Sequence, residues 1–352
     1  MFRIDDATAA GSIPTPEAAG TEGYFTEGNP ATGTPATKVR GSWLNMIQEE
    51  LRAIVVYGGL TPSKTVYTQV RDAIVAKFAK INGDNTQTFS VAPATQGQHA
   101  VPMAQAAGVV GSVRNLVISA TAVTNNVLVT ADEIIVETAL GGIRYCLPSF
   151  SKAVTLTTTG AGGMDTGSAP VSGYVAIYAI WNPTTQTAAL LAQNASTLRS
   201  NVYTGANMPA GYTASALISV WPTNSGGNLI AGYQVDRNFS FASTNVLSTS
   251  TTQASFTSLA MAGVVPPNAR SIKGTLNAQL SSAGASLGAA VAASSTGIGG
   301  VTIQTSTAAA NNSQVVGVFT LDLVTAQTLF YTFQTTGGSG PTLVISVSGY
   351  TL

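Results

Sequence analysis

The pattern of apolar and polar positions changes twice along the 352-residue chain. Residues 1 to about 40 have no regular period and are dense in proline and glycine, which disfavour helices and central strands. From residue 42 to about 81, apolar residues recur every three or four positions, as on one face of a helix. Beyond residue 114 the period is two, which is typical of strands. The pattern therefore predicts an extended segment, a short helical region and a long β body.

The extended segment contains large apolar side chains although it has no local core to receive them. Its order should therefore come mainly from whatever it packs against, and these side chains would be the anchors of a docking peptide. They are Phe2, Ile4, Ile13, Tyr24 and Phe25.

The first predicted helix begins near Ser42, a suitable N-cap, and ends at Gly58-Gly59. Its apolar stripe consists of Trp43, Leu44, Ile47, Leu51, Ile54 and Val55. The second predicted helix follows Pro62 and ends at Asn82-Gly83-Asp84, with Tyr67, Val70, Ile74, Phe78 and Ile81 on one side. The two helices can pack as a hairpin, or they can bury their stripes against other copies of the chain.

Strands fall into two groups separated by turn residues. The first group is predicted at 114–121, 127–138, 143–147, 151–158, 172–181, 187–194, 214–222 and 228–235. Its spacing resembles an antiparallel sandwich. Residues 238–252 are either a linker or a first strand of the second group. That group is predicted at 253–261, 270–280, 301–306, 314–323, 327–335 and 342–349, and the small residues of 282–300 fit loops or closely packed strands.

Charge is distributed very unevenly. Of the 30 Asp, Glu, Lys and Arg residues, 17 lie between Arg3 and Asp84, whereas residues 240–352 contain only Arg270, Lys273 and Asp322. Charged residues make up 9% of the chain, against about 25% in a typical soluble domain. Much of the surface should therefore be hidden in an oligomer, or be kept wet by hydroxyls and amides. The formal net charge of zero gives no attraction to nucleic acid or to an anionic membrane.

Targeting and metal-binding signals are weak. No stretch approaches the roughly 18 apolar residues of a membrane span, and the acidic start does not resemble a signal peptide. The single cysteine, Cys146, excludes an intrachain disulfide and a cysteine-based zinc cluster, and its apolar neighbours predict a buried, inert thiol. The single histidine, His99, is interpreted as structural or surface-exposed. No cofactor is expected.

Catalytic groups are scarce in the β body, so we do not expect an enzyme. The acids beyond residue 110 are Asp132, Glu133, Glu137, Asp165, Asp236 and Asp322. Adjacent acids on a strand point to opposite faces, so Asp132 and Glu133 should not converge. Glu133 and Glu137 can share a face, but a solvated strand edge is the simpler interpretation. The run 160–165 lacks the lysine of a phosphate loop and is predicted to be a turn.

Most aromatic side chains of the β body are predicted to be core residues and not ligand platforms. They are Tyr174, Tyr178, Trp181, Trp221, Phe330, Tyr331, Phe333 and Tyr350.

The N-terminal sequence, Phe2-Arg3-Ile4-Asp5-Asp6 and the run from Pro14 to Thr65, resembles the N-terminal segment of bacteriophage tail fibre proteins. The resemblance covers about residues 1 to 80. Residues 85–105 look like one copy of the short shaft repeat of such fibres, and 130–136, 160–174 and 205–212 look like a β domain of the same proteins. The last 110 residues resemble fibre tips in composition and position only.

This resemblance implies a homotrimer without a cofactor, located in the virion tail. Its N-terminus would attach to a tail or baseplate protein through Phe2, Arg3, Ile4, Asp5, Ile13, Tyr24 and Phe25. Trp43, Leu44, Ile47, Leu51 and Ile54 would face the other copies in the trimer. The predicted regions are a docking segment (1–40), helices (41–84), a short shaft (85–112), a β-sandwich (113–239) and a β tip (240–352).

Host recognition is expected in residues 240–352, where low charge suits a surface glycan or a pilus protein. Two alternatives remain open. A trimeric, tailspike-like polysaccharide depolymerase would need a carboxylate pair across a groove. A bacterial adhesin or prophage-derived surface protein would need an export signal.

Overall fold

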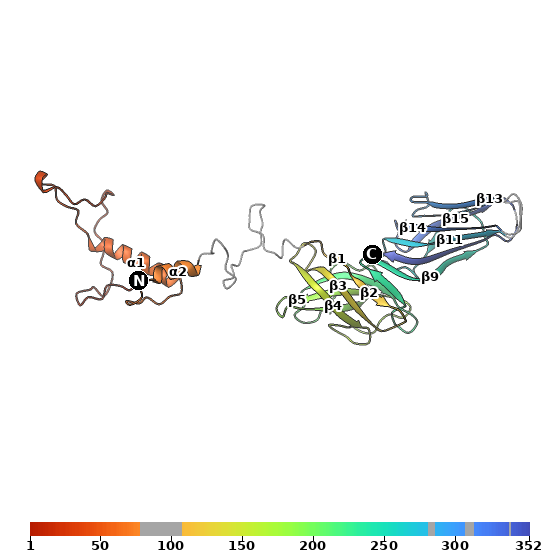
Figure 1. Ribbon diagram of the computed structural model, residues 1–352, viewed down its shortest axis with the longest axis horizontal. Coiled ribbons are helices and arrows are strands. Elements are labelled where there is room, and N and C mark those ends of the chain that lie inside the picture. Colours follow the sequence, from red (N-terminus) through yellow and green to blue (C-terminus); the bar gives the residue numbers. More distant parts are fainter. Residues whose placement is uncertain (78–107, 281–285, 307–312, 338) are drawn as a thin grey trace. The chain divides into compact units, whose positions relative to one another are not determined.

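The computed structural model describes residues 1–77, 108–280, 286–306, 313–337 and 339–352, and its contacts divide the chain into two compact units, 1–91 and 92–352 (Figure 1). The first unit contains two helices and the second contains the strands. The expected fold class, mainly β with a short helical N-terminal region and antiparallel sheets, is confirmed. The predicted shaft at 85–112, with His99, lies largely outside the described residues.

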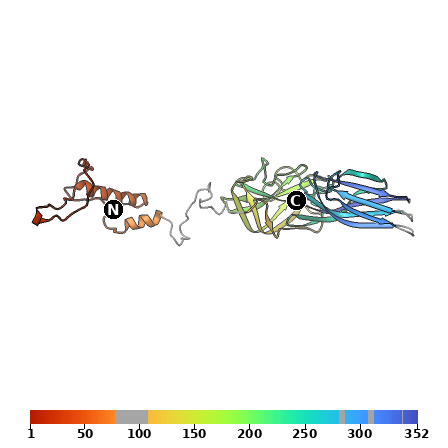
Figure 2. The same cartoon turned by 90° about the horizontal axis from the view of Figure 1, so that it is seen from above.

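Helices α1 (Gly41–Tyr57) and α2 (Gln69–Lys77) pack side by side as a hairpin (Figures 1 and 2). Val55 and Ala73 are fully buried between them. Gly58 makes this close approach possible, since a Cβ atom there would lie 2.7 Å from the Cα of Ala73. The hairpin alternative is thus the arrangement found within one chain.

The helix ends differ in part from the predicted ones. Arg40 is the N-cap of α1 and makes no side-chain capping bond, so the N-cap assignment to Ser42 is wrong. Ser42 lies inside the first turn, and its hydroxyl donates instead to Glu17 (2.9 Å). The predicted stop is confirmed, because Gly58 caps α1 and Gly59 adopts a left-handed φ of 80°. Tyr67 precedes α2, while Phe78 and Ile81 lie outside the described residues.

Residues 26–37 form a small arm that turns back on itself, although this segment was expected to be simply extended. Asn29 and Thr34 exchange two backbone hydrogen bonds (2.8 and 3.0 Å), and the Thr37 amide donates to the Thr26 carbonyl (2.9 Å). A single 3₁₀ turn, η1 (Pro30–Thr32), forms the tip, and the Asn29 side chain caps it. Local turn chemistry therefore orders part of the proline-rich segment.

The β unit contains sixteen strands among its described residues, and every pairing between them is antiparallel. Twelve form one sheet in the order β14-β11-β16-β9-β8-β2-β3-β7-β5-β6, with β1 and β4 also paired to β3; the other four form the sheet β10-β15-β12-β13. The strands are β1 (Val113–Arg114), β2 (Val117–Ala120), β3 (Asn126–Glu137), β4 (Arg144–Thr155), β5 (Tyr174–Asn182), β6 (Thr187–Asn194), β7 (Ala214–Pro222), β8 (Gly232–Val235), β9 (Asn238–Thr249), β10 (Gln253–Ala260), β11 (Ser271–Leu280), β12 (Ser286–Ala292), β13 (Val301–Ser306), β14 (Ser313–Asp322), β15 (Thr328–Thr335) and β16 (Thr342–Thr351).

One large apolar core runs through this unit, and a smaller buried cluster that includes Tyr178 and Leu217 lies on the other face of β5 and β7. The large sheet folds over between β3 and β7, which share the single pair Glu137–Ser215, and side chains of β3 and β4 meet those of β5, β6 and β7. Farther along, side chains of β12 and β15 join those of β11 and β16 in the same core. The strand β9 crosses the boundary expected near residue 240 and pairs with both β8 and β16.

Three segments clarify what the strand pattern left open. Residues predicted as two strands, 143–147 and 151–158, form the single strand β4, and Pro148 is accommodated because β4 pairs only with β3 among the described strands. Residues 238–249 are a strand, not a linker. Within 282–300, the small residues of β12 form a closely packed strand between β15 and β13.

Cys146 is exposed on β4, so the prediction of a buried thiol is wrong. In the run Tyr145-Cys146-Leu147 the first and last side chains face the core and Cys146 points away from it, because neighbouring residues of a strand alternate between faces. Partial burial, and then the nearby Glu133 carboxylate, raise the pKa of the thiol above its ordinary value.

Cys146 should therefore react with a maleimide in the folded protein, slowly at neutral pH and faster as the pH rises, since the thiolate is the nucleophile. Labelling followed by intact mass would measure this rate, and Cys146→Ser would control for other sites. A thiol that reacted only after denaturation would contradict the exposed position.

Candidate functional site

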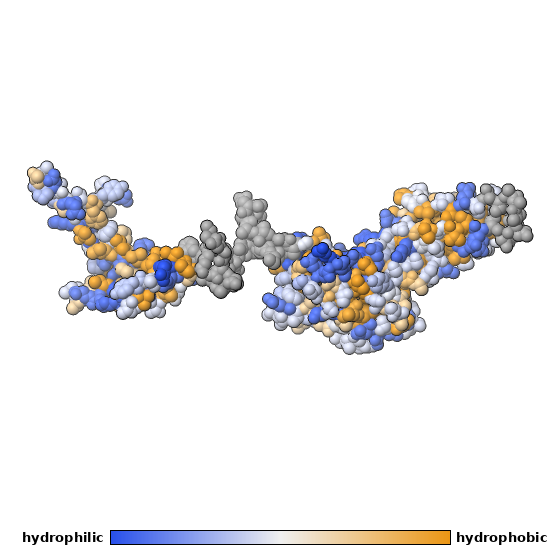
Figure 3. All heavy atoms as spheres, in the orientation of Figure 1, coloured by the Kyte–Doolittle hydropathy of each residue, from blue (hydrophilic) through white to orange (hydrophobic). Residues whose placement is uncertain are grey.

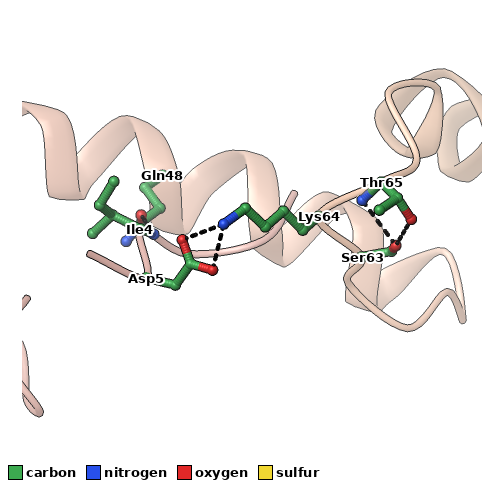
Figure 4. A network of polar contacts seen from close by, with 6 residues as sticks. All are labelled: Ile4, Asp5, Gln48, Ser63, Lys64 and Thr65. Carbon is green, nitrogen blue, oxygen red and sulfur yellow. Dashed lines mark hydrogen bonds and ion pairs between the residues drawn. The ribbon is translucent and has the colours of Figure 1, made fainter. Parts of the chain in front are cut away.

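The first six residues form an ordered strap across α1 and the loop that follows it (Figure 4). The guanidinium of Arg3 donates from Nε and Nη2 to the two carboxylate oxygens of Glu49, both at 2.7 Å. One residue later, the backbone amide of Ile4 donates to the Gln48 side chain (2.7 Å). This fork geometry fixes the direction of the strap as well as its position.

A second ion pair holds the strap to the loop between the helices. Lys64 Nζ donates to both carboxylate oxygens of Asp5, at 2.8 and 2.6 Å. This hydrogen bond is the main cause that lowers the pKa of Asp5, and the bond from Arg3 likewise lowers the pKa of Glu49. Arg3 and Asp5, both predicted attachment residues, thus bind groups of their own chain.

Gln69 joins the strap, the loop and α2, and it is nearly fully buried. Its Oε1 accepts hydrogen bonds from the Met1 amine (3.0 Å) and the Ser63 amide (2.9 Å), and its Nε2 donates to the Thr61 carbonyl (2.7 Å). The sequence reasoning missed Glu49, Lys64 and Gln69. Their partners lie 46 to 68 residues away along the chain, so no local pattern could identify them.

Acid should release the strap. The pKa values of Asp5 and Glu49 lie below the ordinary values of about 3.9 and 4.3. The stabilisation that their ion pairs give the strap is therefore fully present above the ordinary values, and it is lost as the pH falls through the lowered pKa values. We expect the amide resonance of Ile4, which bonds to Gln48, to move between about pH 5 and about pH 2.

The double variant Arg3→Gln, Lys64→Gln is the matched control, because it keeps both side chains polar and unbranched but removes their charges. Its Ile4 resonance should already lie at the acid-limit position at neutral pH. An acid-insensitive resonance in the unmodified protein would contradict the ion-paired strap.

The predicted attachment side chains remain largely accessible. Tyr24 is 98% exposed at the base of the arm, and Ile4 and Ile13 are each about two thirds exposed. Phe25 packs edge-on against Trp43, with ring centroids 5.0 Å apart. The structure thus brings one predicted attachment residue against one predicted trimerisation residue.

The helical stripe is only partly used within the chain. Ile47 and Leu51 are half-buried, whereas Trp43, Leu44 and Ile54 remain exposed. Between α1 and α2 lies an open groove of ≈ 550 Å³, lined by Ala53, Ile54, Tyr57, Ala73, Ile74 and Lys77. Figure 3 shows apolar residues gathered over these helices. This groove, here called the hairpin groove, can take further apolar side chains.

Several acids of the β unit are held by structural contacts. Glu137 is buried and binds Arg144, so it is not available to act with Glu133. Asp165 accepts from the Tyr203 hydroxyl and the Gln193 amide, both at 2.9 Å, and Asp236 accepts from the Leu116 amide (3.0 Å). The loop at 160–165 is the predicted turn, closed by backbone bonds between Gly160, Gly163 and Met164.

The aromatic residues of the β unit mostly occupy the core, as predicted. Tyr174, Tyr178, Trp221, Tyr331, Phe333 and Tyr350 are buried, while Trp181 and Phe330 are half-buried. Tyr233, which the sequence reasoning did not single out, is instead 47% exposed on β8. Burial raises the pKa of Tyr203 to about 12, with a further contribution from its hydrogen bond to Asp165.

Among the residues that the structure describes, no group of three or more His, Cys, Asp and Glu side chains is arranged to hold a metal ion. Nor is any helix in the described part of the chain long and apolar enough to cross a membrane.

No protein family model matches the chain. The chain is similar to the uncharacterized protein StfP of Escherichia coli K12, with 38% identity over 93 residues, which cover 24% of this chain and 43% of StfP. It thus spans less than half the length of that relative. A solved structure, that of a Bacillus thuringiensis Cry1Da tryptic core variant, aligns with 73% of this chain and 56% of the Cry1Da chain at 11% sequence identity. Its TM-score of 0.18 is too low to support any conclusion.

Proposed function

We propose that this protein is a structural tail fibre of a bacteriophage, which attaches to the tail or baseplate through its helical unit and binds a host surface receptor through its β unit. The observation that carries the proposal is the difference in charge and structure between the two units. The first holds most of the charge, the strap and the exposed anchors; the second is a large, nearly uncharged β structure.

The attachment role rests on the accessible side chains of the first unit. Tyr24 and Ile13 are exposed on the segment that joins the strap to the arm, and both of those ends have hydrogen-bonded backbones, so a partner would meet side chains held between ordered elements. Preorganisation lowers the entropy cost of binding. The resemblance of residues 1–80 to fibre attachment segments and the partial similarity to a bacterial protein support this assignment.

The assembly is a homotrimer in this proposal. Ile54 lines the hairpin groove, and Trp43 and Leu44 are exposed near the start of the same helix; such apolar surface is costly to leave in water. Light scattering should return about three times the chain mass of 35.7 kDa. Ile54→Glu should shift the mass toward that of one chain, whereas Val39→Glu, at a more exposed apolar residue outside the helices, should not. A single-chain mass for the unmodified protein would refute the trimer.

The attachment experiment is to propagate the phage with a chain lacking residues 2–35. The truncated protein should remain soluble with a folded β unit, but purified virions should lack it in immunoblots. Tyr24→Ala with Ile13→Ala should weaken incorporation without removing any backbone. Normal incorporation of the truncated chain would place the docking site in the helices.

Receptor binding is tested by adding fluorescently labelled protein to a panel of bacterial strains and by competing with phage adsorption. Binding to no strain would overturn this part of the proposal. The enzymatic rival, a polysaccharide depolymerase, predicts release of oligosaccharide from capsule or lipopolysaccharide. We expect no release of oligosaccharide, because the carboxylate of Glu137 is bound to Arg144 and that of Asp165 accepts hydrogen bonds from Tyr203 and Gln193.

A further inference from the structure

A row of side chains crosses the outer face of the large sheet where its two halves join. The pairing register places Tyr233 of β8 opposite Ser240 of β9, Ser240 opposite Gly349 of β16, and Gly349 opposite Lys273 of β11. Four neighbouring strands thus contribute one residue each. Phe239 and Tyr350, their sequence neighbours, point the other way into the core.

Gly349 lets the lysine reach across its strand. A Cβ atom at this position would overlap Cε of Lys273 and lie 3.3 Å from its Cγ, so the lysine stem occupies the space that a side chain would fill. Nζ of Lys273 then donates to Oγ of Ser240 at 2.8 Å. The ammonium group therefore lies over β9, the strand that pairs with the Tyr233 strand β8.

The ammonium group retains capacity for a ligand. It has three donors and uses one on Ser240. No carboxylate among the described residues lies within 4.0 Å of the ammonium group. Asp322 of β14 lies opposite Ser271, which is two residues before Lys273 on β11. Residues 240–352 contain only three charged side chains, and Asp322 is the single acid among them.

The aromatic ring beside this cation gives the row a second kind of contact. Tyr233 is 47% exposed and lies directly opposite Ser240; the Cβ atoms of such pairs are about 5 Å apart, so the two side chains are cross-strand neighbours. Two residues further along, on the same face, the Thr351 hydroxyl donates to the Asn238 side chain (2.9 Å), which adds an amide and a hydroxyl.

We propose that Lys273, Ser240 and Tyr233 form a contact site for an anionic sugar of the host surface. The sugar's carboxylate or phosphate accepts from Lys273, its hydroxyls bond to Ser240 and Asn238, and an apolar ring face packs on Tyr233. A single cation is too little for nucleic acid, whose binding requires several. The site rests on the receptor-binding role proposed above, and it specifies anionic sugars as the class of receptor ligand.

The test is calorimetric titration of the full-length protein with trigalacturonate, neutral galactotriose and glucose 6-phosphate. The first and third separate a carboxylate from a phosphate source, and the second supplies the ring without the charge. The unmodified protein should bind at least one anionic probe more tightly than galactotriose. Lys273→Gln should weaken that binding about tenfold, the loss expected for one charge-assisted hydrogen bond.

Lys152→Gln is the matched control, because Lys152 is also exposed on a strand of the β unit but lies outside this row. Tyr233→Ala should weaken both charged and neutral probes, whereas Tyr233→Phe should retain most binding. Equal binding by Lys273→Gln and the unmodified protein would overturn the site, as would equal affinity for charged and neutral probes or no binding to any of the three.

Cell binding separates failure of this site from failure of the proposed function. If the unmodified protein and Lys273→Gln bind bacterial cells equally, the receptor-binding role stands and the site is wrong. If the unmodified protein binds no cells, the receptor-binding role itself fails, whatever the calorimetry gives.

Discussion

Replacing Trp221 by alanine should lower the free energy of unfolding of the β unit by about 3–5 kcal/mol. Trp221 is fully buried, and its ring packs edge-on against Phe239 with centroids 4.5 Å apart. Its Nε1 donates to the Ile230 carbonyl (3.0 Å), so the truncation also leaves a buried acceptor without this donor. Phe239 in turn packs on Tyr350 (4.8 Å), which links β7 through β9 to the last strand.

This substitution also tests whether the two β regions unfold together. The Tyr350 hydroxyl donates to the Val220 carbonyl (2.6 Å), and the core is shared across the expected boundary. Hydrogen exchange should therefore show protection falling in peptides from β5–β7 and from β11–β16 alike. Leu198→Ala, at an exposed apolar site, should change stability by less than about 0.5 kcal/mol. Loss of protection confined to residues 113–235 would indicate two independent domains.

Substituting alanine for Gly274 should cost about 1–3 kcal/mol, toward the upper end of that range. Gly274 lies on β11 between β14 and β16. An added Cβ would overlap the Ser346 carbonyl oxygen and lie 2.7 Å from Cζ of Phe319. The carbonyl belongs to a paired strand and cannot rotate away, so the strands must separate locally.

Gly263→Ala is the control, since a Cβ there meets no atom within 4 Å. It should be neutral or slightly stabilising, because it reduces the freedom of the unfolded chain. Denaturant unfolding of both variants measures the difference. Equal midpoints would show that β11 and β16 can separate without cost at this position.

The hydrophobic pattern was sufficient for most of the secondary structure. Period-two alternation identified strands such as β3, β11 and β15, because a strand with one buried face must alternate. The same reasoning placed Trp221 and Tyr350 in the core. It could not place Cys146, because the exposed position of that thiol depends on which face of β4 meets the core.

The sequence by itself determined the fold class, the helix stop at Gly58-Gly59 and the contrast between a charged head and an uncharged β body, since each follows from local composition and periodicity. Only the tertiary structure decided which distant groups meet. Arg3 reaches Glu49, Asp5 reaches Lys64, and Lys273 reaches Ser240, in each case through chain folding over 33 to 59 residues. Such pairings depend on strand register and helix packing, which are set by the whole core, so they cannot be predicted from the sequence around each residue.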